Sequence, residues 1–272
     1  MMALTTDIIT EYAFARAYGQ LDSPGFRETM HEALVECYVV GHFALHFPVV
    51  FPILDSLPDW ITLRVKPELR PVVGIKYDLA KQVRDIRDGL NEGHKAAAHA
   101  TIFHEMLNSD QPESEKTDAR LGDEAQLIVA AGLVTTSRAL TVGSYHLIAN
   151  PTIVANLRAE LQGADINLDQ LDWNRLVSLP YLHGIVHESI RLAHGITTRS
   201  PRLAPDQELR YGEYVIARNT PVSMTTVDIL MNPRVFPEPR EFKPERWIEG
   251  GEELKRYFVA FGRGARGCMG VK

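Results

Sequence analysis

The sequence predicts a mainly α-helical protein with a small β region towards its C-terminal end. Apolar residues recur at helical spacing through much of the first two thirds of the chain. Residues 208–216 alternate around Gly212, which is the pattern of a β-hairpin. Between residues 232 and 247 a proline occurs every few positions, and this spacing predicts an extended meander that is neither helix nor sheet.

The individual elements follow from the same patterns, taken in chain order. Helical spacing predicts helices over residues 3–19, 25–42, 76–91, 101–107, 123–149, 152–162 and 174–193. Prolines punctuate residues 47–71, so only short helical pieces are expected there, and the polar segment 110–120 is expected to be a solvated connection. The most apolar helix, 123–149, should end at Asn150-Pro151, because proline suits the first turn of the next helix. A further strand is expected at 221–226.

Composition and charge narrow the class of protein. The chain has 272 residues, 45% of them apolar and 24% charged, which is ordinary for a soluble globular protein. A net charge of -6 is too mild to indicate a nucleic-acid partner. The two cysteines, Cys37 and Cys268, lie far apart in unrelated contexts, so an intracellular protein without a disulfide framework is expected. The most apolar stretch, 43–54, is too short to span a bilayer, so no membrane anchor is expected within the chain.

The clearest chemical signal is a glycine-rich loop that carries one thiol, residues 261–270 (FGRGARGCMG). Its four glycines allow positive φ angles and a close approach of the backbone to a flat or bulky group. Backbone N–H groups and the positive charge of Arg266 would stabilise a thiolate at Cys268. A lone cysteine in such a turn is more often buried and inert, but the full spacing Phe-x-x-Gly-x-Arg-x-Cys-x-Gly favours a functional thiolate.

This loop resembles the haem-binding loop of the cytochrome P-450 superfamily, with every defining position from Phe261 to Gly270 present. The resemblance implies that Cys268 is the axial thiolate ligand of the iron of haem b, where it favours cleavage of the O–O bond. It also implies that Phe261 packs on the thiolate side and that Arg266 binds a haem propionate. These residues are the expected cofactor-binding site.

A predicted helix and the meander carry a second part of the resemblance. Glu188 and Arg191 lie three residues apart on one helical face and can form an ion pair, which alone would be an ordinary surface contact. Residues 242–247 (FKPERW) are similar to the meander motif of the family. By resemblance, Arg246 joins Glu188 and Arg191 in a buried charged triad that is structural rather than catalytic.

The apolar helix contains a segment, residues 131–136 (AGLVTT), that resembles the oxygen-binding segment of the family. The resemblance implies that Gly132 leaves room over the haem. It also implies that Thr135 is catalytic and hydrogen-bonds dioxygen or the water that delivers protons. The alternative is a core helix in which Thr135 bonds back to its own backbone. Where the family carries an acidic residue this chain has Val134, which cannot relay a proton.

Basic residues carry two further expectations. Arg199 matches the position of a second propionate-binding arginine in the family, and Arg202 is a neighbouring alternative. Residues 232–272 contain nine Lys and Arg against six Glu, a net charge of +3. A basic patch there would suit an acidic reductase, which the family docks on the thiolate side, although a solvated charged surface would have the same composition.

By this resemblance, residues 1–272 form a single partial haem-thiolate monooxygenase domain that is truncated at both ends. It would run from the middle helices of the fold through the Cys loop, without the helix that follows the loop, and it is most similar to fungal secondary-metabolism members. The full-length parent is expected to be anchored in the endoplasmic reticulum membrane. Segments 33–47, 127–135 and 196–201 are expected to line the substrate pocket, and their apolar character indicates a hydrophobic substrate.

The implied activity is insertion of one oxygen atom of dioxygen into a hydrophobic small molecule, with electrons from an NADPH-dependent cytochrome reductase. Two alternatives stay open. The chain as given would be a non-catalytic fragment with little or no haem binding, or it would be a haem-thiolate enzyme with peroxide-driven or isomerase chemistry. The second alternative gains from Val134.

Overall fold

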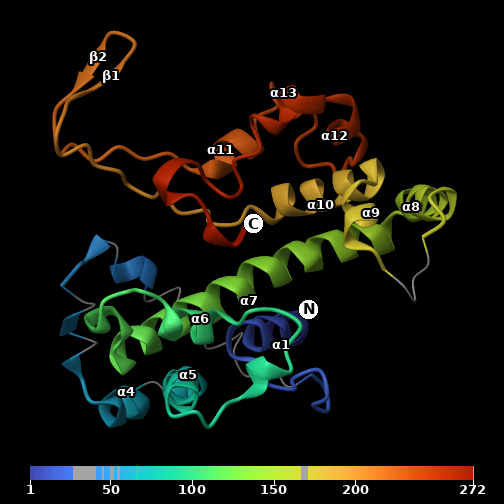
Figure 1. The fold of residues 1–272 in the computed structure, drawn as a ribbon. Coiled ribbons are helices and arrows are strands. Elements are labelled where there is room, and N and C mark those ends of the chain that lie inside the picture. The colour runs from blue at the N-terminus through green and yellow to red at the C-terminus, as the bar shows by residue number, and fades with distance from the viewer. Residues whose placement is uncertain are drawn as a thin grey trace. The chain divides into compact units, whose positions relative to one another are not determined.

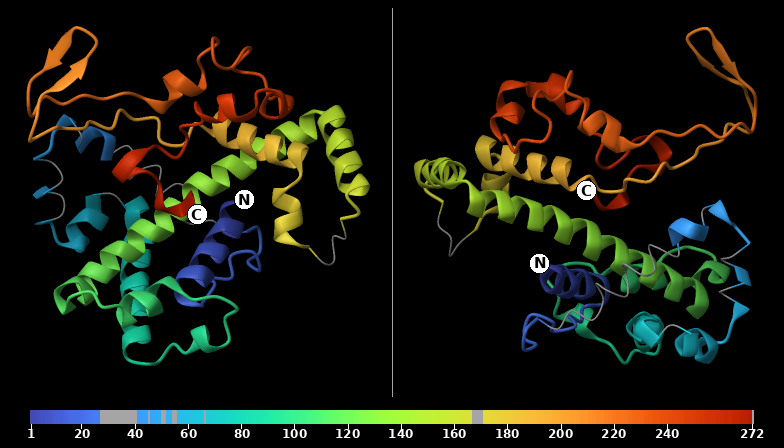
Figure 2. Two further views of the ribbon diagram at one scale, coloured as in Figure 1. Left: turned by 45° about the horizontal axis from the view of Figure 1, so that its top comes forward. Right: turned by 180° about the vertical axis from the view of Figure 1, so that it is seen from behind.

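The computed structural model describes residues 1–26, 41–44, 46–49, 52–53, 56–65, 67–166 and 171–271 (Figure 1). The predicted fold class is confirmed, because the structure is mostly helical and has one small two-stranded sheet (Figure 2). The chain divides into two compact units, Met1–Ser137 and Arg138–Lys272, and each is described separately below. Most of the predicted helix 25–42, including Cys37, lies outside the described residues.

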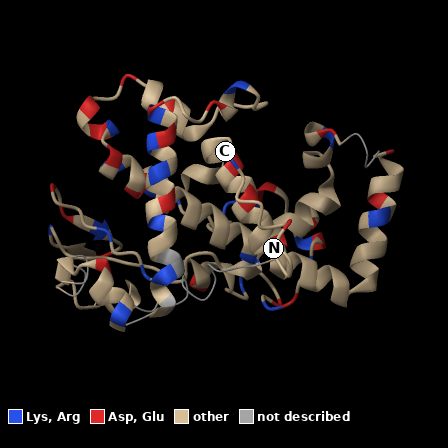
Figure 3. Ribbon diagram, turned by 90° about the horizontal axis from the view of Figure 1, so that it is seen from below, with Lys and Arg blue, Asp and Glu red and all other residues tan. Residues whose placement is uncertain are grey.

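The described part of the first unit contains helices, turns and loops but no strand. It contains α1 (Met2–Phe14), α4 (Asp59–Val65), α5 (Arg70–Arg87), α6 (Ile102–Asn108) and the first part of α7 (Asp118–Ala149). Short 3-10 turns lie at Pro67–Leu69, Gly93–Lys95 and Glu113–Lys116. In both units, basic and acidic residues are interspersed along the ribbon (Figure 3).

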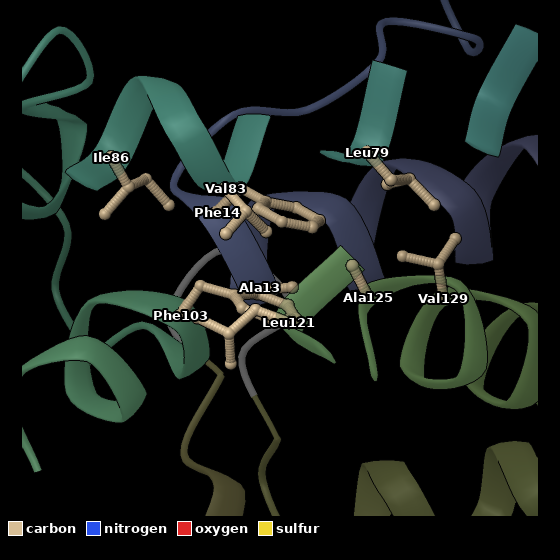
Figure 4. Close-up of a cluster of buried hydrophobic side chains, with 9 residues drawn as sticks. All are labelled: Ala13, Phe14, Leu79, Val83, Ile86, Phe103, Leu121, Ala125 and Val129. Atoms are coloured by element: carbon tan, nitrogen blue, oxygen red, sulfur yellow. The ribbon is translucent and has the colours of Figure 1, made fainter. Parts of the chain in front are cut away.

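The core of the first unit joins α1, α5, α6 and α7 (Figure 4). Its fully or nearly fully buried members are Ala13, Phe14, Leu79, Val83, Ile86, Phe103, Leu121, Ala125 and Val129. The rings of Phe14 and Phe103 stack at a centroid distance of 4.7 Å. Burial of such side chains is the main stabilising contribution to the unit and fixes α1 against α7.

The second unit contains helices and a short β-hairpin, and several of the helices pack against α10 (Pro180–Ala193). It contains α8 (Pro151–Gly163), α9 (Trp173–Val177), α10 (Pro180–Ala193), α11 (Thr226–Leu230), α12 (Glu245–Glu249) and α13 (Gly251–Lys255). The strands β1 (Leu209–Tyr211) and β2 (Tyr214–Ile216) form the antiparallel hairpin predicted around Gly212, with Tyr211 opposite Tyr214. At the start of α10 the Glu160 carboxylate accepts the N–H groups of Tyr181 and Leu182 at 2.7 and 2.9 Å. An acidic side chain in this place stabilises a helix N-terminus.

Two helix boundaries in the first unit differ from the predicted ones for local reasons. The predicted helix 3–19 ends at Phe14, because Ala15 adopts the left-handed conformation with φ 53°. The chain then folds back, and the Asp7 carboxylate accepts the N–H groups of Gln20 and Leu21. The predicted helix 76–91 begins earlier, at Arg70, where a proline in the first turn lacks only an N–H that would stay unpaired.

The polar segment 110–120 was predicted as a solvated connection, and this is only partly correct. It contains the 3-10 turn Glu113–Lys116, and α7 begins within it at Asp118. Lys116 is buried, and its ammonium group donates to the Ser109 carbonyl at 2.5 Å. One short polar run thus supplies a buried cation that satisfies a backbone acceptor.

Three predictions in the second unit are corrected. The helix predicted over 174–193 is two helices, α9 and α10, because the second begins at Pro180, which cannot donate to a preceding turn. The strand predicted at 221–226 is a single antiparallel bridge between Arg202 and Val222. The meander 232–247 ends in helix rather than in extended chain, because α12 starts at Glu245.

Among the described residues one helix, α7, is long and apolar enough to cross a membrane, with a mean hydropathy of 1.4 over its most apolar window. Core helices of soluble proteins can have the same length and composition. The segment 131–136 lies in this helix.

Candidate functional site

The Cys268 thiol stands at the surface of a closed turn in the second unit. It is free and exposed. The N–H group of Cys268 donates to the Phe261 carbonyl at 2.8 Å, and the N–H group of Gly267 donates to the Gly264 carbonyl at 3.0 Å. Gly264 has a φ of +73°, which favours glycine. These contacts shape the loop so that its one thiol faces outwards.

The charged triad is assembled around the Glu188 carboxylate, which is completely buried. Oε1 of Glu188 accepts from Nη2 of Arg191 at 2.7 Å and from Nε of Arg246 at 2.9 Å. Oε2 of Glu188 accepts from Nε of Arg191 at 2.8 Å. The guanidinium of Arg191 is also completely buried. The structure therefore brings the three predicted residues together, and at this site the ion pair of Glu188 and Arg191 is not a surface contact.

Two donors to Glu188 were not predicted. The indole Nε1–H of Trp247 donates to Oε2 at 2.9 Å, and the backbone N–H of Lys243 donates to Oε1 at 3.1 Å. Both residues lie in the motif 242–247. The sequence therefore indicated where these residues lie in the chain but not that their N–H groups point at Glu188. With these contacts every oxygen of the buried carboxylate has at least two donors, as a buried charge requires.

The guanidinium of Arg191 uses its remaining hydrogens to hold the meander. Its Nη1 donates to the carbonyls of Leu230 and Pro239 at 2.9 and 2.7 Å, and Nη2 donates to the carbonyl of Glu241 at 3.2 Å. The carbon of the guanidinium also lies 5.2 Å from the ring centre of Phe236. A planar donor group with five hydrogens can satisfy all these acceptors at once.

The pKa of Glu188 is the result of two opposing effects. Burial raises this pKa. Hydrogen bonds and charge from Arg191, with contributions from the Lys243 N–H and Arg246, outweigh burial, so the pKa lies below the ordinary value of 4.5. The carboxylate is therefore ionised at neutral pH, as the two arginines require.

A row of aromatic rings connects the triad with the Cys268 loop. The ring of Trp247 contacts Phe258 at 5.2 Å, and Phe258 contacts Phe261 at 5.9 Å, both edge to face. The ring of His187 lies tilted against that of Phe258, with centroids 4.7 Å apart, and burial lowers the pKa of this histidine, which favours its neutral form. Phe261 in turn accepts the N–H of Cys268. The triad thus connects to the thiol loop through Trp247, Phe258 and Phe261.

Arg199 and Arg202 differ in how their guanidinium groups are occupied. Nη1 of Arg202 donates to carbonyls of its own loop, those of Ser200 and Pro201, and its backbone pairs with Val222. Arg199 is exposed. Its segment is tied down where Thr225 donates to the carbonyl of Thr197 at 3.1 Å. Arg199 is therefore the better placed of the two to bind an anion.

Thr135 lies in α7 within the first unit, whereas the other predicted site residues lie in the second unit. Its hydroxyl is exposed and donates to the carbonyl of Ala131 at 2.9 Å. This is the back-bonding that the alternative interpretation predicted, although the side chain is not in a core. The hydroxyl oxygen can still accept a hydrogen bond while its hydrogen is shared with the helix.

Gly132 has a neighbour in α1 that the sequence did not predict. A Cβ at this position would lie 2.9 Å from Cγ1 of Ile9 and 3.0 Å from its Cδ1. The glycine therefore allows close packing of α1 against α7. The structure thus gives packing against Ile9 as one reason for a glycine at this position, and the expectation that Gly132 leaves room over a haem stays a prediction.

We expect Gly132→Ala to lower the free energy of unfolding by about 1 kcal/mol, since overpacking costs about 1–3 kcal/mol and alanine returns up to about 1 kcal/mol in a helix. Adding Ile9→Ala should recover part of that overpacking cost, which a double-mutant cycle by thermal or denaturant unfolding would detect. Gly122→Ala is the matched control on the same helix, because its Cβ would meet Ala80 at an ordinary 3.4 Å. Equal effects at both glycines would contradict the packing explanation.

The residues of the second unit fit a haem. A soft thiolate is an accepted axial ligand of haem iron, and arginines bind carboxylates such as the propionates. Cys268, Arg199 and Arg266 are all exposed and supply this donor set. A Cβ at Gly264 would meet nothing within 4 Å, and one at Gly262 would lie 3.8 Å from the nearest atom, so the loop leaves space for a flat group.

Comparisons with known proteins show the family of this chain. The family model described as Cytochrome P450 matches residues 1–272. The cytochrome P450 monooxygenase MO6277 of Ascocoryne sarcoides is 36% identical over 98% of this chain and 55% of the relative. The cytochrome P450 monooxygenase tpcC of Cochliobolus heterostrophus is 37% identical over 99% of this chain and 52% of the relative. The chain thus spans about half the length of these fungal relatives.

A solved structure supports the fold. The crystal structure of the cytochrome P450DA haem domain matches with a TM-score of 0.69 at 22% identity, covering 99% of this chain and 56% of that one. Haem is the cofactor of the family and of this domain, and the residues around Cys268 suit it. The family model and the fungal relatives together show that this chain belongs to the cytochrome P-450 family.

Proposed function

We propose that the chain is the haem-binding part of a monooxygenase that inserts one oxygen atom of dioxygen into a hydrophobic small molecule. The observation that carries the proposal is the exposed thiol of Cys268, which is presented by a closed glycine turn and supported by the triad. When bound through a thiolate, haem supplies dioxygen binding and reductive cleavage of the O–O bond. The protein contributes the ligand, the propionate contacts and a route for protons.

The roles of the residues follow from their positions. Cys268 provides the axial sulfur, and Arg199 and Arg266 offer exposed guanidinium groups for the two propionates. Phe261 holds the loop through its carbonyl, which accepts the N–H of Cys268, and its ring contacts Phe258. Glu188, Arg191 and Arg246 hold the meander, and through Trp247 they support the loop.

Thr135 is the residue proposed to pass protons in the first unit. Its Oγ1 is exposed and can hold a water molecule as an acceptor while it donates to Ala131. The neighbouring Val134 has no polar atom, so the water must receive its proton from solvent or from a group on the substrate.

Electrons are proposed to come from an NADPH-dependent cytochrome reductase with an acidic face. Five exposed arginines of the basic segment 232–272 support this: Arg234, Arg240, Arg256, Arg263 and Arg266. Two of its lysines are paired with acidic residues, since Lys243 contacts Glu238 and Glu241 and Lys255 contacts Glu252. The arginines therefore carry the positive charge that steers an acidic partner.

We also propose a membrane-associated location for the full-length parent.

The test is the absorption spectrum of the reduced, carbon-monoxide-bound chain after addition of haem, followed by dioxygen consumption with a reductant. A strongly red-shifted Soret band supports the proposal, as does dioxygen consumption that depends on the reductant. Failure to take up haem would favour the alternative of a non-catalytic chain. Turnover with peroxide but not with dioxygen and reductant would favour the peroxide-driven alternative, which Val134 also supports.

We expect Thr135→Ala to raise the peroxide released per electron consumed by about two- to ten-fold, the factor that one lost hydrogen bond represents. Val134→Glu should lower peroxide release, because it supplies an acid beside the same hydroxyl. Thr136→Ala is the matched control, since it removes a hydroxyl from the adjacent exposed residue. If all three variants release peroxide as the unaltered chain does, protons do not reach the haem through Thr135.

A further inference from the structure

Helix α1 contacts α7 at the turn that carries Thr135, through two residues that no motif indicated. Thr5 is buried, and its Oγ1 lies 3.1 Å from the carbonyl oxygen of Leu133. Ile9 fills the space beside Gly132. Because Thr5 and Ile9 are four residues apart, they lie on one face of α1. One face of α1 therefore meets two consecutive residues of α7.

The hydrogen bond from Thr5 ties down a backbone group. The same hydroxyl also lies 3.0 Å from the carbonyl of Met2 and 3.3 Å from that of Met1, so its one hydrogen is shared among three acceptors. The acceptor in α7 belongs to Leu133, whose side chain is completely buried. A buried carbonyl in this position gains more from a donor than one that solvent can reach.

The contact lies close to the proposed catalytic hydroxyl. Gly132 and Thr135 are three residues apart and share a face of α7, while Leu133 precedes Thr135 by two residues. The hydroxyl of Thr135 itself donates to Ala131, within the same turn. A side-chain donor on a helix carbonyl tilts that carbonyl and bends the turn, so it changes the direction of the side chains that follow.

We propose that Thr5 is a positioning residue for Thr135: its hydrogen bond to the Leu133 carbonyl, with Ile9 packed against Gly132, fixes the turn of α7 from which the Thr135 hydroxyl acts. The proposal rests on the proposed function for the role of Thr135. The geometry of the contact itself does not depend on a bound haem.

The experiment compares three variants of the 272-residue chain. Thr5→Val removes the hydroxyl and keeps the shape of the side chain, while Thr5→Ser keeps the hydroxyl. Thr6→Val is the matched control on the next residue, because the Thr6 hydroxyl is buried and has no hydrogen-bond partner among the described residues. Without haem, amide hydrogen exchange is measured over 131–137 in α7 and over α5 as an internal reference.

Thr5→Val should speed exchange over 131–137 relative to α5 by about two- to ten-fold, the factor expected for one lost hydrogen bond, whereas Thr5→Ser and Thr6→Val should not. In the haem-loaded chain, Thr5→Val should raise peroxide released per electron, and Thr5→Ser should restore the unaltered ratio. A general loss of stability would speed exchange in α5 equally and would overturn the proposal, as would unchanged exchange in Thr5→Val.

The two proposals fail in different ways. If the unaltered chain takes up no haem, the proposed function fails, but the exchange measurement still decides whether Thr5 holds the turn. If the chain binds haem and Thr5→Val changes exchange but not peroxide release, Thr5 is structural only, and its role as a positioning residue for Thr135 is rejected.

Discussion

Glu188→Ala is expected to lower the free energy of unfolding by about 3–5 kcal/mol, because it leaves Arg191 as a buried, uncompensated charge. Both side chains of this pair are completely buried. The same variant removes the acceptor of Trp247, so the row of rings that ends at Phe261 loses its support. We therefore also expect loss of haem binding, measured as haem content per chain beside the melting temperature.

The chain offers a matched control for this result. Glu208 and Arg210 form an ion pair with the same N–O distance of 2.7 Å, but their side chains are 48% and 73% exposed. Glu208→Ala should change stability by less than about 1 kcal/mol, because solvent screens an exposed pair. Similar losses of unfolding free energy for the two variants would show that burial of the triad does not increase the cost of removing the carboxylate.

The pKa of Glu188 adds a dependence on pH. Because its folded-state pKa is lowered from 4.5, the stabilisation is present above that value and is lost as pH falls through the folded-state pKa. The unfolded chain binds the extra proton in this window, so the unaltered protein should lose stability on acidification. Glu188→Gln cannot release a proton, and its difference from the unaltered chain should narrow below about pH 4.5.

The parts of the site that sequence could predict are those that a spacing defines. Cys268, Glu188, Arg191 and Arg246 were recognised from short motifs, and the structure places the three charged residues in one cluster. Trp247 was in a recognised motif without a role, because the direction of its N–H depends on how α12 packs on α10. Side-chain directions of this kind come from tertiary packing, which no local pattern encodes.

The boundaries of the helices were harder to predict than their existence. Residues 3–19 are apolar at helical spacing beyond the end of α1, but a single residue in the left-handed conformation, Ala15, ends the helix. That conformation is compensated by contacts of Asp7 with Gln20 and Leu21, which lie over ten residues away in the chain. Glu160, which lies in α8, likewise accepts an N–H group at the start of α10, a contact that no local pattern predicts.

The contacts of α7 with α1 could not be predicted from the sequence for a related reason. Gly132 was predicted to make room for a cofactor, and the glycine does allow a close approach, but the neighbour is Ile9. A glycine in a helix indicates that something lies close and not what that neighbour is. Thr5 carries no motif at all, and its long-range hydrogen bond to Leu133 is a tertiary contact that no local pattern predicts.

Cys268→Ser is expected to abolish the thiolate-type spectrum of the reduced, carbon-monoxide-bound chain completely. The reason is that serine keeps the size of the side chain but replaces the soft sulfur by a hydroxyl that remains protonated at neutral pH. Stability should change by less than about 0.5 kcal/mol, since Cys268 is exposed and the hydrogen bond from its backbone N–H to Phe261 is retained. Loss of the band without unfolding would thus assign the ligand.

The other cysteine of the chain provides the control for this prediction. Cys37→Ser removes the only other thiol and should leave the red-shifted band intact. If Cys268→Ser kept the band and Cys37→Ser lost it, the glycine-rich loop would not be the ligand loop. If the chain showed the band only with Cys268 present, this thiol would be the ligand. The soft sulfur, the closed turn and the buried triad would then account for thiolate ligation, because all three are present in a chain that spans about half the length of its relatives.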